Sequence, residues 1–174
     1  MSQLQCNSIV PVGGIPAGAS GGGIIQCVQT VLTSAFTLAS AAGTFSNLTG
    51  LSVTITPRST NSKVLIYYTV QGSSADNAGM HTKLQRGGVD ILLGDAAGSD
   101  TRCTTGGFFA SSGSNETHTN AIMYIDSPAT TSATTYQVVI SGGGSTVYVN
   151  RSVTTGNAYN PRCPSMILAM EISG

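Results

Sequence analysis

Few residues in this chain could act as a catalytic base, because it holds only two histidines, His81 and His118. Nucleophilic catalysis needs a Ser or Cys beside such a base, together with an acid that orients it. Neither histidine stands in a motif of that kind, and in so serine-rich a chain a Ser near a His is expected by chance. The sequence therefore predicts a protein that is not an enzyme.

Carboxylates could act in pairs in glycoside hydrolysis or as ligands of a hard cation. Most lie in or beside segments rich in Gly, Asn and Ser, and nothing in their spacing pairs any two of them or matches a twelve-residue calcium loop; they are Asp76, Asp90, Asp95, Asp100, Glu116 and Asp126. Solvated turn residues account for them, so we expect neither a metal nor another cofactor.

The four cysteines, Cys6, Cys27, Cys103 and Cys163, are widely spaced and form no Cys-x-x-Cys pair. Metal ligands and redox pairs are normally close in sequence. We expect unpaired and mostly buried thiols.

Charge is scarce, since 8% of the 174 residues are Asp, Glu, Lys or Arg against about 25% in an ordinary soluble domain. Ser, Thr, Asn, Gln and 22 Gly supply the polarity instead, which favours rigid β-structure packed against other protein. A net charge of +0 argues against a nucleic-acid partner. The start lacks a secretory signal and no run is long enough to span a membrane, so we expect synthesis in a cytoplasm.

Residues 1–23 differ from the rest, because Ile9, Val10, Val12 and Ile15 alternate with Pro and Gly before the stretch "GASGGG". Such a segment cannot form a helix and has no hairpin partner. We interpret it as an extended arm with apolar side chains that dock on another subunit or surface.

Residues 24–174 read as about ten short β-like runs separated by turn residues, without a helical repeat. This pattern predicts an all-β fold, an antiparallel β-sandwich that is most simply a jelly roll.

Two of the runs, "KVLIYYTV" and "MILAMEI", are apolar on both faces, although a two-layer sandwich buries only one face of each sheet. A second copy of the chain is the simplest cover, which predicts an obligate homo-oligomer, and the alternative is that a long loop or the arm covers this face. The candidate interface residues are Leu65, Tyr67, Met166, Ile167, Leu168, Ala169 and Met170. Which face of the last strand meets the core and which meets the partner stays open, as does whether Glu171 pairs with Arg151, faces a channel or lies at the surface.

Several stretches, among them "GLSVTITPRSTNSKVLI", "LQRGGVDIL" and "SMILAMEI", resemble small virion proteins of tailed bacteriophages, especially those of cyanobacteria and marine bacteria. The resemblance runs in patches over roughly Ile24 to Ile172. It implies a tumour-necrosis-factor-like jelly roll that assembles as a homotrimer. Members occur as cement or knob proteins on the capsid and as distal tips of tail fibres.

The resemblance and the composition together suggest a capsid decoration protein of a phage head, located in the virion, that binds the major capsid protein and stabilises the shell. Only about 23 residues precede the sandwich, too few for the shaft of a fibre. The alternative is a tail-fibre tip that recognises host surface glycans, for which exposed aromatics such as Tyr159 are suited. A secreted lectin-like or enzymatic sandwich is disfavoured by the absence of a signal and of a catalytic motif.

Overall fold

The computed structural model describes residues 23–75, 78–108 and 115–174. The predicted docking residues Ile9, Val10, Val12 and Ile15 lie outside these ranges, as does Asp76. The arm and its role stay predictions.

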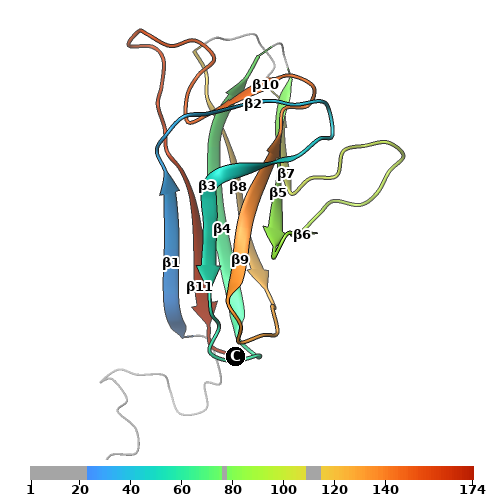
Figure 1. The fold of residues 1–174 in the computed structure, drawn as a ribbon, viewed down its shortest axis with the longest axis vertical. Helices are drawn as coiled ribbons and strands as arrows, with labels where there is room; N and C mark the ends of the chain where they lie inside the picture. The colour runs from blue at the N-terminus through green and yellow to red at the C-terminus, as the bar shows by residue number, and fades with distance from the viewer. Residues whose placement is uncertain (1–22, 76–77, 109–114) are drawn as a thin grey trace, which may run out of the picture.

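The described residues form strands and no helix, which confirms the all-β prediction (Figure 1). The predicted runs "KVLIYYTV" and "MILAMEI" each lie within one strand. The strands are β1 (Ile24–Leu32), β2 (Phe36–Ala39), β3 (Ser46–Ile55), β4 (Lys63–Ser74), β5 (Gly79–Arg86), β6 (Val89–Ile91), β7 (Thr105–Phe108), β8 (His118–Asp126), β9 (Thr134–Ser141), β10 (Thr146–Val149) and β11 (Ser165–Ile172).

Two antiparallel sheets pack face to face, as predicted for a sandwich (Figure 1). Sheet A has the order β1-β11-β4-β10-β2 with β8 also paired to β4, and sheet B has the order β3-β9-β5-β6 with β7 also paired to β5. Because Gly72 pairs with both β8 and β10, these two strands lie on opposite edges of β4. The long strand β4 is therefore the centre of sheet A.

Alternation along each strand builds the core between the sheets. In β4, Val64, Ile66, Tyr68 and Val70 are completely buried, whereas the residues between them are only half-buried. The same alternation in β9 turns Tyr136, Val138 and Ile140 inward, and Leu48 and Leu51 of β3 join them. At roughly 25 cal/mol per Å² of apolar surface removed from water, this contact between the sheets is the main source of stability.

The structure decides which face of β11 meets the core. Ile167 and Ala169 are completely buried and belong to the hydrophobic core, opposite Tyr68 and Ile66 of β4. Their predicted place at a subunit interface is therefore wrong. Because side chains along a strand alternate between its two faces, assigning one residue to the core assigns all the others. The sequence does not say which residue of β11 belongs to the core.

Glu171 follows Ile167 and Ala169 on the inner face of β11 and is also completely buried. Its carboxylate accepts hydrogen bonds from the backbone N–H of Arg58, at 2.7 Å, and from Nε2 of Gln26. Burial acts to raise the pKa of this carboxyl, but the hydrogen bonds and the charge of Arg58 outweigh it and hold the pKa below its ordinary value. Glu171 is thus neither a surface residue nor a partner of Arg151.

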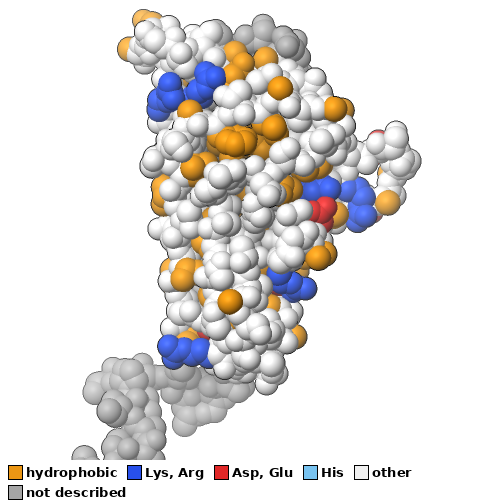
Figure 2. All heavy atoms as spheres, in the orientation of Figure 1, with side chains coloured by type: hydrophobic (Ala, Val, Ile, Leu, Met, Phe, Trp, Pro, Cys, Tyr) orange, Lys and Arg blue, Asp and Glu red, His pale blue; other side chains and the backbone are white. Residues whose placement is uncertain are grey.

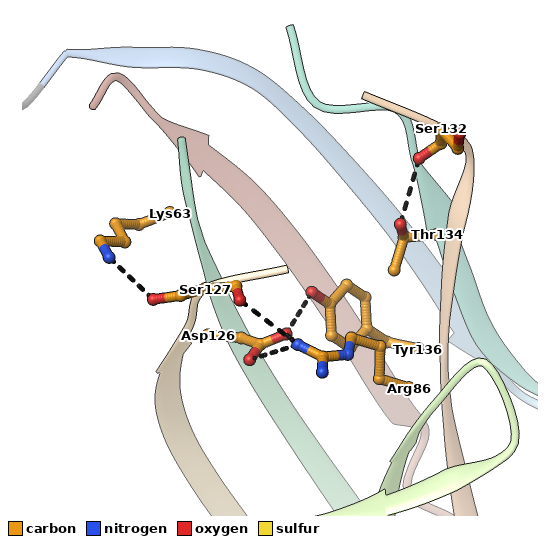
Figure 3. Close-up of polar contacts among 7 residues, drawn as sticks. All are labelled: Lys63, Arg86, Asp126, Ser127, Ser132, Thr134 and Tyr136. Atoms are coloured by element: carbon orange, nitrogen blue, oxygen red, sulfur yellow. Dashed lines mark hydrogen bonds and ion pairs between the residues drawn. The ribbon is translucent and has the colours of Figure 1, made fainter. Parts of the chain in front are cut away.

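A second buried carboxylate, Asp126 at the end of β8, ties the two sheets together (Figure 3). Arg86 of β5 donates from Nη1 to both of its oxygens, at 3.0 and 2.9 Å, and Tyr136 of β9 donates from its hydroxyl at 2.7 Å. Burial and the neighbouring carboxylate raise the pKa of Tyr136, so its proton stays in this hydrogen bond. We call these three residues the base clamp.

Candidate oligomer interface

The outer face of sheet A carries side chains that the sandwich itself does not cover. Cross-strand pairing places them in rows that run over β1, β11, β4 and β8, since directly paired residues point to the same side of a sheet. The three rows are Cys27-Met170-Leu65-Ile125, Gln29-Leu168-Tyr67-Met123 and Val31-Met166-Thr69-Ala121. We call this surface the sheet A face.

The sheet A face is apolar and partly open to solvent. Met123 is 72% exposed, Ile125 54% and Val31 50%, while Leu168 and Tyr67 at its centre are half-buried by their neighbours. In the described strands the charged side chain on this face is Lys63, at the start of β4. A contiguous apolar surface of this kind marks an interaction site in a soluble protein.

The other side of the molecule has a different character. With β3 and β9 towards the viewer, Figure 2 shows mainly backbone and uncharged polar side chains, with hydrophobic side chains in separate groups and one larger patch beneath the β2–β10 pair. Lys and Arg side chains are scattered over this side in small groups (Figure 2). The sheet A face is therefore the better candidate for subunit contact.

Five of the seven predicted interface residues lie on the sheet A face: Leu65, Tyr67, Met166, Leu168 and Met170. The structure brings them together, and whether a partner covers them stays a prediction. Sequence reasoning missed Val31, Met123 and Ile125, which extend the same surface. The signal was available for β8, because "AIMYI" is also apolar on both faces.

The two histidines considered for catalysis lie on different strands, His81 on β5 and His118 on β8. His118 lies 3.4 Å from the carboxylate of Glu116, and both side chains are about half exposed. His81 lies on β5, where burial lowers the pKa of its imidazole. Across the ranges that the structure covers, no three His, Cys, Asp or Glu side chains are grouped to hold a metal ion.

The described cysteines are unpaired, as predicted: Cys27, Cys103 and Cys163 are free. Their predicted burial is wrong, since Cys27 is exposed on the sheet A face and the other two are half-buried. Among the described residues there is also no helix of the length and hydropathy needed to cross a membrane.

No protein-family model matches the chain, and no curated protein matches it significantly.

Proposed function

We propose that the protein is a homotrimeric structural protein of a virus particle, a decoration protein that binds the outer surface of a tailed-phage head and stabilises it. The observation that carries this proposal is the sheet A face. A surface with Met123, Ile125 and Val31 open to solvent is costly for an isolated chain, and a second copy covers it without any further partner.

We propose three copies because of the patches of sequence that resemble trimeric phage proteins. The strands β1-β11-β4-β8 face the strands β3-β9-β5-β7, and we propose that this two-sheet order is that of a jelly roll. The phage proteins that the sequence resembles assemble as trimers around such a sheet. The sheet A face lies on β1, β11, β4 and β8, so it would line the contact between subunits.

A structural role also agrees with the composition. The low charge suits a chain that packs against other protein. As a decoration protein it would act by binding and not by catalysis. Each trimer would bridge neighbouring coat subunits and oppose the outward pressure on the shell.

Mass measurement of the purified protein at micromolar concentration tests the oligomer. Light scattering and native mass spectrometry should give three times the chain mass of 17.6 kDa. A monomer would overturn the assignment of the sheet A face, and a dimer would overturn the trimer.

Imaging tests the location. Electron microscopy of the virions with a gold-labelled antibody against this chain should find many copies spread over the head. Label confined to the distal end of the tail would overturn the decoration role and support a receptor-binding tip instead. No label on any part of the particle would overturn both.

A further inference from the structure

A hollow beside the base clamp has the features of an anion site. It lies between the β5–β6 turn and the loop that joins β8 to β9, and has a volume of about 340 Å³. Its lining residues are Arg86, Gly87, Pro128, Thr130, Ala133, Thr134 and Thr135. No acidic side chain is among them.

The base clamp fixes the guanidinium of Arg86 in place before any ligand arrives. Nη1 is held by both oxygens of Asp126, whose side chain is 7% exposed, and Asp126 is held in turn by Tyr136. A donor that is already oriented loses little conformational entropy when it binds a ligand.

The rest of the same guanidinium is unused. In the part of the chain that the structure describes, Nε and Nη2 of Arg86 have no acceptor, and Nη2 points away from Asp126 (Figure 3). The Arg86 side chain is 36% exposed and lines the hollow. Two parallel N–H groups of a guanidinium match the two oxygens of a carboxylate.

Charge at this end of the molecule favours an acidic partner. We call the end of the sandwich where β1 begins the base. Arg58 and Lys63 are exposed there, whereas Asp126 is buried in an ion pair and Glu171 is buried and hydrogen-bonded. Strand β1 also begins at this end of the sandwich (Figure 1).

We propose that the hollow receives the carboxylate of an Asp or Glu side chain from the coat protein, and that the base is the end of the trimer that docks on the shell. This rests on the proposed function for the identity of the partner. The carboxylate would bridge Nε and Nη2 of Arg86, with Thr130 and Thr135 at the sides of the hollow.

Nuclear magnetic resonance of the full-length protein tests the site with a small probe. Titration with Nα-acetyl-glutamate α-amide, which carries one free carboxylate, should shift the Nε–H signal of Arg86 and the amide signals of residues 130–135 in a saturable way. The uncharged control, Nα-acetyl-glutamine α-amide, should produce no such shifts. Unsaturable shifts, or equal shifts at Arg58 and Arg151, would overturn the site.

A variant that leaves the base clamp intact tests the hollow itself. Thr135→Glu adds a carboxylate to the lining and should weaken probe binding at least tenfold. Thr131→Glu adds the same charge outside the lining, in the loop that precedes β9, and should leave binding unchanged. Equal effects of the two substitutions would overturn the proposal.

Loading onto particles separates this inference from the proposed function. If the chain decorates heads, Thr135→Glu should lower its occupancy at least tenfold relative to Thr131→Glu. Normal occupancy of Thr135→Glu would overturn the docking site and leave the decoration role standing. Absence of the wild-type protein from heads would overturn the decoration role, while saturable probe binding would still support a carboxylate site at Arg86.

Discussion

Asp126 and Glu171 are the two carboxylates that the described part of the chain buries, and each has a defined set of donors. Asp126 is held by side chains from the opposite sheet, whereas Glu171 is held by a loop backbone and a neighbouring strand. A buried charge that loses its partners is strongly destabilising, so both sites should respond to single substitutions.

Asp126→Ala should lower the free energy of unfolding by roughly 2–3 kcal/mol, because it leaves the Tyr136 hydroxyl without an acceptor. The loss is smaller than that of a fully buried pair because the Arg86 side chain is 36% exposed. Urea denaturation at fixed protein concentration measures it. Asp95→Ala, in an exposed loop, is the control, and a comparable loss in that variant would argue against the base clamp.

Glu171 should make stability depend on pH in the acid range. Since its pKa is lower in the folded than in the unfolded chain, the unfolded chain binds more protons between the two values. The contribution of Glu171 is therefore complete above the unfolded pKa of about 4.3 and is lost as the pH falls through the folded pKa.

Urea denaturation between pH 3 and pH 7 tests this dependence. Glu171→Gln should flatten the acid side of the stability profile. Glu116→Gln changes an exposed carboxyl in the same way and serves as the matched control. If both variants flattened the profile equally, the buried carboxyl would not be its cause.

At the scale of the elements, β11 separates two roles along one strand. Its inner residues Ile167 and Ala169 hold the sandwich together, and its outer residues Leu168 and Met170 lie in the middle of the sheet A face. Substitutions at adjacent positions of β11 should therefore affect different properties, assembly in one case and folding stability in the other.

Leu168→Lys should dissociate the oligomer and leave the β-sheet content unchanged, because a charge placed in an apolar contact opposes assembly but not folding. Light scattering and circular dichroism measure the two effects. Val89→Lys replaces a side chain that is 66% exposed on β6 and should leave the oligomer intact. An oligomer that survives Leu168→Lys would exclude the centre of the sheet A face from the contact.

Ile167→Ala should instead lower the free energy of unfolding by about 2–4 kcal/mol, the range expected when a buried Ile is truncated in a packed core. Chemical denaturation measures the loss, with Met166→Ala on the outer face as the neighbour for comparison. A smaller loss for Ile167→Ala than for Met166→Ala would contradict the inward orientation of Ile167.

At the scale of the whole molecule, the sandwich has two ends and two broad faces with different properties. The sheet A face is apolar, while the base carries exposed cations and the start of β1 (Figure 1). Assembly through the face and docking through the base are compatible, since the two surfaces do not share residues other than Lys63 at their border.

Deletion of residues 1–23 tests this division. The truncated chain should keep its oligomeric mass, because the sheet A face is intact, and should lose attachment to particles from which the protein is absent. Light scattering and a co-sedimentation assay measure the two properties. Unchanged attachment would remove the arm from docking, and a loss of oligomeric mass would place it in the subunit contact instead.

The sequence by itself determined the β-strands and the presence of a second apolar face that a two-layer sandwich does not cover. Alternation in "KVLIYYTV" and "MILAMEI" shows that both faces of these strands are apolar, and turn residues between the runs mark where strands end. These are local properties, because they depend only on residues that are close together in the sequence.

Only the tertiary structure decided which face was which. Strand alternation is unchanged when every side chain moves to the opposite side, so Ile167 and Leu168 were equivalent until pairing with β4 placed one of them against Tyr68. The base clamp and the partners of Glu171 depend on residues 10 to 145 positions apart that sheet packing brings together. No local sequence pattern predicts such contacts, because they form between residues that are far apart in the sequence and lie on different strands.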